Sequence, residues 1–154
     1  MTTKPTILIV EARFYTEIAD QLAEGATKAL DAAGYEHERL AVPGVFEVPA
    51  AIRMALRSME IHSSSRSYAG FIALGCVIRG ETSHYDYVCS ESARALQDLA
   101  VGHRLPIGYG VVTVENEAQA IERAFVDRRD KGGDAAAACL AMYALRRRLA
   151  STAG

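Results

Sequence analysis

The chain has 154 residues and a net charge of −2; half of its residues are apolar and 23% are charged. Enough apolar side chains are present to bury a core without disulfides or a structural metal, which excludes a disordered chain. The near-neutral charge excludes a basic surface that would hold nucleic acid or an acidic membrane.

The first half of the chain alternates predicted strands and helices. A continuous apolar run at residues 6–10 is typical of a strand covered on both faces. Apolar residues at helical spacing predict a helix over residues 16–33, with Gly34 at the position just past its end. A shorter strand over Glu36–Val42 then precedes a helix whose first turn contains Pro49.

The second half repeats this alternation. After a polar loop at residues 63–67, an apolar run predicts a buried strand over Tyr68–Ile78. A helix that ends near Gly102 follows, and then a fourth strand over residues 106–114.

Two more helices are predicted at the C-terminal end. Asn116, with Gln119 three residues later, forms a capping-box pattern that predicts a helix extending to residue 125. The glycine pair at residues 132–133 is expected to end this helix, and Asp134 is expected to cap a last, alanine-rich helix that reaches about Leu149.

Strands that alternate with helices at this chain length predict a parallel sheet with helices on both faces. We expect a flavodoxin-like three-layer α/β/α sandwich with a four-stranded parallel sheet. Ligands of such folds bind outside the carboxyl ends of the strands. The loops expected to carry function are therefore those at residues 11–15, 42–49, 78–84 and 112–116.

The loop at residues 79–84 joins a buried strand to a helix and has the features of an anion site. Helix N-termini attract anions through unpaired amides and the helix dipole, and Glu81, Thr82 and Ser83 occupy that position. His84 stands at the same helix start and can transfer protons near neutral pH. The alternatives are that Thr82 or Ser83 only caps the helix and that His84 is structural.

The loops after the first two strands carry aromatic side chains. Phe14 follows the first strand, and Phe46 and Glu47 lie between two prolines after the second. These residues suit a flat platform and a shaped wall that bind a heterocycle or a polyol. Packing in the core is the alternative for the two rings, and support of a helix N-terminus is the alternative for Glu47.

The three cysteines, Cys76, Cys89 and Cys139, are widely spaced and form no C-x-x-C motif. This pattern indicates reduced, mostly buried thiols in the cytoplasm and argues against a zinc site. No apolar segment approaches the length of a membrane span. We expect a single domain over residues 1–154, with a disordered N-terminal segment at residues 1–5.

Five motifs stand at the loops and helices described above. They read ARFY at residues 12–15, VPGVFEVP at 42–49, ALGCVIRGETSHYDYV at 73–88, PIGYGVVTVENEAQAIERA at 106–124 and KGGDAA at 131–136. In order and spacing they resemble the lumazine synthase family, over about residues 7–149. The resemblance implies a cofactor-free condensation in riboflavin biosynthesis, in which 5-amino-6-(D-ribitylamino)uracil and 3,4-dihydroxy-2-butanone 4-phosphate give 6,7-dimethyl-8-ribityllumazine, phosphate and water.

The resemblance also implies a role for each site residue. His84 is the proton shuttle, and Arg123 binds the phosphate together with Glu81 and Thr82, which act chiefly through their backbone. Phe14 stacks on the pyrimidine. The other implied substrate-binding residues are Val45, Phe46 and Glu47 around the ring and ribityl chain, Cys76, Val77 and Ile78 through main-chain contacts to the pyrimidine, Tyr109, and Lys131.

Family sites take an aromatic residue at the position of Tyr109 from a neighbouring subunit, so the resemblance implies a homopentamer with shared sites. The chain departs from the family at two places. Glu81 stands where many relatives have a small residue, so its carboxylate must point away from the phosphate. Residues 125–131 read FVDRRDK, where shell-forming relatives have a glycine-rich turn. Without glycine we expect no sharp bend, and therefore a pentamer or decamer instead of a shell of about sixty subunits.

Three alternatives use the same fold class. A response-regulator receiver needs an acidic pair after the first strand, where this chain has EAR at residues 11–13. It also needs an aspartate at the end of the third strand, where this chain has GCV at residues 75–77, which argues against a receiver. A flavodoxin-type module needs a glycine- and hydroxyl-rich phosphate loop, where this chain has ARFY. A family member that binds a lumazine or flavin with little turnover stays open, although His84 and Arg123 argue against it.

Overall fold

Four parallel strands form one sheet in the order β2-β1-β3-β4. The structure, a computed structural model, describes residues 5–61 and 67–152. The strands are β1 (Thr6–Ala12), β2 (Glu36–Val42), β3 (Tyr68–Ile78) and β4 (Ile107–Val114). Every neighbouring pair is parallel, so the predicted four-stranded parallel sheet is confirmed.

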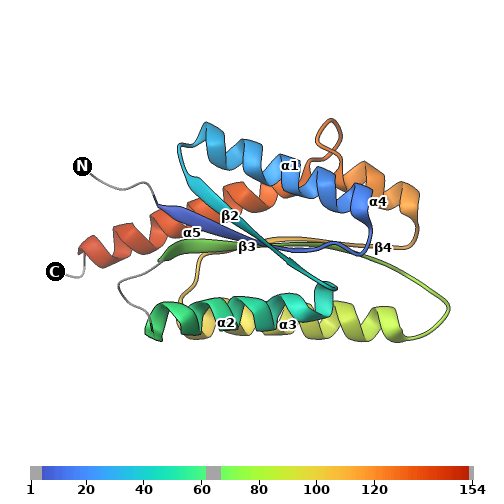
Figure 1. Ribbon diagram of the computed structural model, residues 1–154, viewed down its shortest axis with the longest axis horizontal. Helices are drawn as coiled ribbons and strands as arrows, with labels where there is room; N and C mark the ends of the chain where they lie inside the picture. The colour runs from blue at the N-terminus through green and yellow to red at the C-terminus, as the bar shows by residue number, and fades with distance from the viewer. Residues whose placement is uncertain (1–4, 62–66, 153–154) are drawn as a thin grey trace.

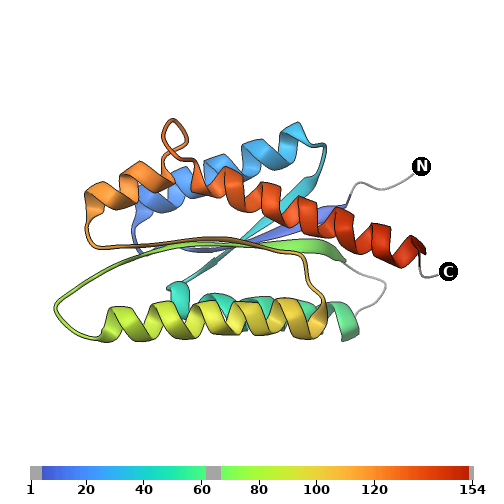
Figure 2. The ribbon, with the colours of Figure 1, turned by 180° about the vertical axis from the view of Figure 1, so that it is seen from behind.

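Helices cover both faces of this sheet (Figure 1). They are α1 (Thr16–Ala32), α2 (Val48–Ile61), α3 (His84–His103), α4 (Glu117–Ala124) and α5 (Lys131–Thr152), with a 3-10 turn, η1 (Val45–Glu47), before α2. Helices α1, α4 and α5 lie on one face and α2 and α3 on the other, and Figure 2 shows the same three layers from behind. The flavodoxin-like three-layer sandwich is therefore confirmed.

Side chains of β1 alternate between two cores. Ile7 and Ile9 pack beneath α1, α4 and α5, whereas Leu8 and Val10 face α2 and α3. None of these four side chains is more than 3% exposed. Burial on both faces explains why the strand reads as a continuous apolar run in the sequence.

The end of β1 contains a buried charge that the apolar pattern did not reveal. The strand continues past the predicted residues 6–10 through Glu11, which is 2% exposed. The Glu11 carboxylate accepts hydrogen bonds from Arg39 of β2, at 2.5 and 2.9 Å, and from Arg13, at 2.5 Å. Burial acts to raise the pKa of Glu11, but the two guanidinium groups outweigh it and hold the pKa below its ordinary 4.5.

Two helix ends follow the signals in the sequence. Gly34 takes a φ of 81° just past the end of α1, the left-handed conformation expected there. Asn116 caps α4 because its side-chain oxygen accepts the N–H of Gln119 at 2.9 Å. Both predictions are confirmed.

The start of α5 differs from its prediction. The helix begins at Lys131, so the glycines at residues 132–133 lie in its first turn and do not precede a cap at Asp134. The carboxylate of Asp130 accepts a hydrogen bond from the N–H of Gly133 at 3.2 Å. This earlier cap satisfies the helix N-terminus and removes the need for one at Asp134.

Some expectations fall on residues that are not described. The N-terminal segment at residues 1–5 and the polar loop at 63–67 lie, apart from Pro5 and Ser67, outside the described ranges. Within those ranges, no helix combines the length and the apolar character needed to cross a membrane.

Gly108 of β4 lies directly against the backbone of α5. A Cβ atom at this position would lie 2.0 Å from the carbonyl oxygen of Ala135. We expect Gly108→Ala to lower the free energy of unfolding by about 2 kcal/mol or more, because two backbone segments must separate to admit the methyl group. Urea denaturation of the purified protein measures this loss.

Gly102 in α3 provides the matched control. Apart from its chain neighbours and the backbone of its own helix, no described atom lies within 4 Å of a Cβ placed there. Gly102→Ala should raise the free energy of unfolding by about 0.5 kcal/mol, because alanine favours the helix. If both variants lose the same free energy of unfolding, the loss in Gly108→Ala does not arise from the contact between β4 and α5.

The buried carboxylate of Glu11 makes stability depend on pH in a defined direction. Because folding lowers its pKa, Glu11 contributes stability above pH 4.5, and this contribution is lost as the pH falls from there through the folded-state pKa. The wild-type protein should therefore have a higher free energy of unfolding than Glu11→Gln at neutral pH. This difference should shrink as the pH falls into the acid range. Urea unfolding at several pH values tests this, and a constant gap would contradict it.

Candidate functional site

A cavity of about 300 Å³ opens at the carboxyl edge of the sheet, a volume within the usual range for small-molecule sites. It lies where β1 and β3 end, beside η1 and the start of α3. Its wall consists of Phe14, Tyr15, Gly44, Val45, Phe46, Glu47, Cys76, Val77, Ile78, His84 and Val88. The strand order turns back between β1 and β3, and ligands of this fold class bind at such a point.

Gly75 lets the segment after β2 pack against the end of β3. A Cβ atom at Gly75 would lie 2.5 Å from Cγ2 of Val45. Val45 is buried in the core, whereas Phe46 is 59% exposed and lines the cavity with Glu47. The alternative that placed Phe46 in the core is therefore wrong, because the tight turn buries Val45 in its place.

Phe14 presents an open aromatic face beside the cavity. The ring is 74% exposed. It meets the ring of Tyr15 edge-on, with the centroids 5.0 Å apart and the planes at 78°. Tyr15 in turn packs against the core beneath α1. A ring supported on one side in this way leaves a face free for stacking.

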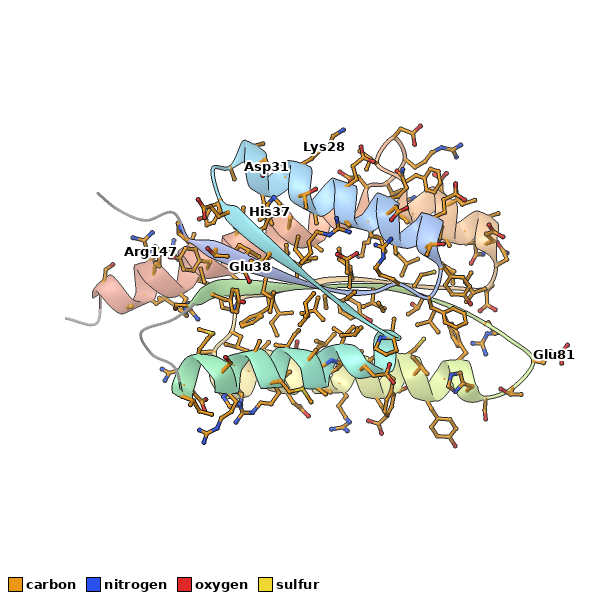
Figure 3. All side chains as sticks on the ribbon, in the orientation of Figure 1. Lys28, Asp31, His37, Glu38, Glu81 and Arg147 are labelled. Atoms are coloured by element: carbon orange, nitrogen blue, oxygen red, sulfur yellow. The ribbon has the colours of Figure 1, made fainter. Side chains whose placement is uncertain are left out.

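The loop between β3 and α3 presents backbone N–H groups at a helix N-terminus. Among the described contacts, the N–H groups of Glu81, Thr82 and Ser83 have no hydrogen-bond acceptor, whereas the Thr82 hydroxyl accepts the N–H of His84 at 3.3 Å. Ser83 is the residue before the helix, but its side chain makes no capping bond. Figure 3 shows the Glu81 side chain extending away from the sheet and helices. An anion could therefore approach these N–H groups without meeting the carboxylate.

Arg79 ties this loop to its surroundings. Its Nε lies 2.9 Å from a carboxylate oxygen of Glu115, after β4, and its Nη2 lies 3.4 Å from Asp86 in α3. The guanidinium also lies over the ring of Tyr85, 4.2 Å from its centroid. The hydrogen bond with Glu115 is the main cause that raises the pKa of Arg79. Arg79 is therefore engaged with protein carboxylates at the edge of the loop.

Cys76 contributes a buried thiol to the cavity wall. Burial raises its pKa to about 12, so the thiol stays protonated at neutral pH and is a poor nucleophile. Burial, together with the nearby Cys76, also raises the pKa of Tyr15. In the described ranges, no group of three or more His, Cys, Asp or Glu side chains could hold a metal ion.

The cavity brings together Phe14, Val45, Phe46, Glu47, Cys76, Val77, Ile78 and His84 from the residues singled out in the sequence. Five others do not line its wall. Glu81 and Thr82 precede His84 in the loop, and Tyr109 lies on β4, 39% exposed. Arg123 stands in the last turn of α4, where it donates to a carbonyl of its own helix at 3.1 Å, and Lys131 begins α5.

The wall also contains Gly44 and Val88, which the sequence analysis did not single out, and Tyr15, which stands beside Phe14 in the ARFY motif but was given no separate role. Val88 lies one helical turn after His84, so helical spacing puts both on one face of α3. Tyr15 and Gly44 adjoin assigned residues in the loops after β1 and β2. Proximity along the chain was the available signal for all three.

Comparison with known proteins identifies relatives over almost the whole chain. Residues 4–147 match the family model described as 6,7-dimethyl-8-ribityllumazine synthase. The chain is 53% identical to the 6,7-dimethyl-8-ribityllumazine synthase of Agrobacterium fabrum, across 96% of this chain and 98% of the relative. It is 54% identical to 6,7-dimethyl-8-ribityllumazine synthase 1 of Rhizobium meliloti, across 93% and 92%, and 52% identical to the synthase of Bartonella tribocorum, across 96% and 94%.

Proposed function

The chain belongs to the 6,7-dimethyl-8-ribityllumazine synthase family, transferases of riboflavin biosynthesis, and we propose how its residues carry out that reaction. The reaction joins 5-amino-6-(D-ribitylamino)uracil, the pyrimidine substrate, to 3,4-dihydroxy-2-butanone 4-phosphate, and releases phosphate. The observation that carries the proposal is the cavity in which Phe14, Cys76 and His84 meet at the point where the strand order turns back.

The pyrimidine ring stacks on the open face of Phe14 in this proposal. The end of β3, at residues 76–78, lines the same cavity and supplies main-chain partners for the polar edge of the ring. Val45 and Phe46 enclose the ring, and the carboxylate of Glu47 accepts hydrogen bonds from the ribityl hydroxyls. The apolar wall and the few polar groups match the make-up of small-molecule sites.

The phosphate of the second substrate binds at the start of α3. The N–H groups of Glu81 and Thr82 and the positive end of the helix dipole favour an anion there, and the outward direction of the Glu81 carboxylate supports this. Arg123 supplies the cation that neutralises the phosphate. Because Arg123 does not line the cavity of its own chain, we assign this role to Arg123 of the adjacent subunit.

The substrates themselves carry the reactive groups. The amine of the pyrimidine attacks the ketone to form an imine, phosphate leaves, and the second ring closes. The protein must hold the two molecules together, which supplies about 7–11 kcal/mol in favourable cases. His84 lines the cavity at the helix start and moves the protons, and the protonated thiol of Cys76 serves only as part of the wall.

The same residues lead us to propose a homopentamer with shared sites. Tyr109 on the edge strand, Arg123 and Lys131 complete the site of a neighbouring subunit. The layer of α2 and α3 exposes large apolar side chains, including Met54 at 70% and Val101 at 69%, which supports an interface on that layer. A head-to-tail contact that repeats around a closed ring produces a pentamer.

The turn between α4 and α5 contains no glycine and bends nonetheless. Asp130 takes a φ of 48°, and its N–H donates to the carbonyl of Phe125 at 3.0 Å. The segment therefore bends sharply without glycine, and the expectation that it would not is wrong. The charge of the turn still supports a closed pentamer that does not assemble further into a shell. Arg128 of the turn pairs with Glu122 of α4 at 2.9 Å, and this places bulky ionic groups at the turn.

We propose the cytoplasm as the compartment of this enzyme. Cys76, Cys89 and Cys139 are all free thiols. Reduced cysteines are the rule in that compartment, where thiols are kept from oxidation.

A turnover assay with both purified substrates tests the proposed function. Formation of the lumazine together with one phosphate per turnover is the expected result. Binding of the lumazine without turnover would instead support the alternative of a family member that binds and does not catalyse.

Arg123→Ala should raise the KM for the butanone phosphate by about tenfold or more, because a charge-assisted contact to phosphate is lost. The KM for the pyrimidine should change by less than about twofold. Arg128→Ala, which removes a nearby exposed cation paired with Glu122, is the control and should leave both values unchanged. Equal losses for the two substrates in Arg123→Ala would remove Arg123 from its assigned role.

His84→Ala should lower kcat by about a hundredfold while the KM for the pyrimidine stays nearly constant. A slow reaction should persist, because both substrates are still held together. His37, which pairs with Asp31 at 3.0 Å elsewhere on the surface, gives the matched control His37→Ala. An unchanged kcat in His84→Ala would mean that the His84 ring is structural.

Sedimentation of the purified protein should give a pentamer or a paired decamer. Mixing His84→Ala and Arg123→Ala subunits, after dissociation and reassembly, should then give more activity than either variant alone when the butanone phosphate is well below its KM, because some mixed interfaces join intact partners. A particle of about sixty subunits would contradict the proposal that assembly stops at a pentamer or decamer. A monomer would contradict the shared site.

A further inference from the structure

The turn that carries Phe14 joins β1 to α1 and packs against the core through the Tyr15 ring. Phe14 is 74% exposed, so packing restrains its ring on one side only, through the edge contact with Tyr15. Tyr15 stands at the N-cap position of α1, and its side chain makes no capping hydrogen bond. A polar interaction adds to this packing and holds the backbone that presents the Phe14 ring.

Arg13 makes that interaction. Its Nη1 donates to the carboxylate of Glu11 at 2.5 Å, and its Nη2 donates to Asp20 in the second turn of α1. One guanidinium thus joins the end of β1 to α1 across the turn that contains Phe14. Arg13 is not part of the cavity wall, so these contacts do not compete with substrate.

Glu11 gives Arg13 a fixed point in the core of the molecule. Its carboxylate is 2% exposed, and Arg39 on the neighbouring strand β2 holds it through Nε at 2.5 Å and Nη2 at 2.9 Å. A buried charge is costly unless it is paired and hydrogen-bonded, and an apolar side chain would fill this position without that cost. The paired charge therefore serves to fix the groups that surround it.

From this geometry we infer that Glu11, Arg13 and Arg39 form a positioning group for the pyrimidine substrate. Arg39 fixes Glu11, Glu11 fixes Arg13, and Arg13 holds the turn in the conformation that presents Phe14. None of the three residues touches the substrate. The inference rests on the proposed stacking of the pyrimidine on Phe14, and its effect is confined to the binding of that one substrate.

Arg13→Gln is the principal test, because it cuts the link to the turn and leaves the buried pair of Glu11 and Arg39 intact. We expect the KM for 5-amino-6-(D-ribitylamino)uracil to rise about fivefold, since a small displacement of a binding surface weakens binding strongly. The KM for the butanone phosphate and kcat should stay within about twofold of wild type. Glu11→Gln should give the same pattern, and thermal unfolding monitors whether each variant is folded.

A double variant shows whether Arg13 acts through Phe14. Phe14→Ala alone should raise the KM for the pyrimidine about tenfold, the scale of a lost base–aromatic stack. Adding Arg13→Gln to Phe14→Ala should then change the KM by less than about twofold, because the ring that Arg13 positions is already gone. Glu38→Gln is the control: Glu38 precedes Arg39 on β2 and accepts the Tyr68 hydroxyl at 2.7 Å, and loss of its charge should leave all three kinetic values unchanged.

The outcomes separate this inference from the proposed function. A pyrimidine KM that rises in Phe14→Ala but not in Arg13→Gln overturns the positioning role and leaves the stacking role intact. If the KM increases of the two single variants add fully in the double variant, Arg13 does not act through Phe14 and contributes to stability alone. The same conclusion follows if the losses in Arg13→Gln fall equally on both substrates or on kcat. If Phe14→Ala leaves the KM unchanged, the stacking on Phe14 fails, and the positioning role fails with it.

Discussion

Burial of β1 and β3 on both faces is the constraint on which the rest of the structure depends. Each of these central strands must be covered by helices above and below, so the chain crosses over the sheet on both sides. The connections that leave β1 and β3 therefore diverge at the carboxyl edge. The cavity opens where they diverge, and its wall comes from the loops and helix ends that the crossovers require.

In the proposed function, one chain supplies only part of the site that the reaction needs. Phe14, Phe46 and His84 line the cavity, whereas Arg123 on α4 and Tyr109 on β4 do not. Two substrates must be bound together, and the phosphate of one of them needs a cation. The proposal of shared sites follows from this mismatch between the chemistry and the residues of a single chain, and it makes assembly a condition of activity.

Paired charges fix the loops of the carboxyl edge. Arg79 joins the loop before α3 to Glu115 and Asp86, and Arg13 joins the turn after β1 to Glu11 and Asp20. In both cases a planar guanidinium connects the loop to the strands or helices beside it. Catalysis by proximity depends on surfaces that are already in position, so rigid loops suit this reaction better than mobile ones.

The sequence by itself determined the alternation of strands and helices, the layers and most of the cavity wall, because burial on two faces and turn chemistry leave local patterns. It predicted the strands Glu36–Val42 and Tyr68–Ile78 with the bounds that the structure gives. It ended the first strand too early, because a charged residue such as Glu11 is expected at the surface. Only the structure shows that Glu11 is paired with Arg39, which is distant in sequence. It placed the cap of α5 at Asp134 instead of Asp130, and it did not foresee the sharp bend without glycine. The absence of Arg123 from the cavity wall was likewise decided only by the tertiary structure, because it depends on where separate elements come to lie in space.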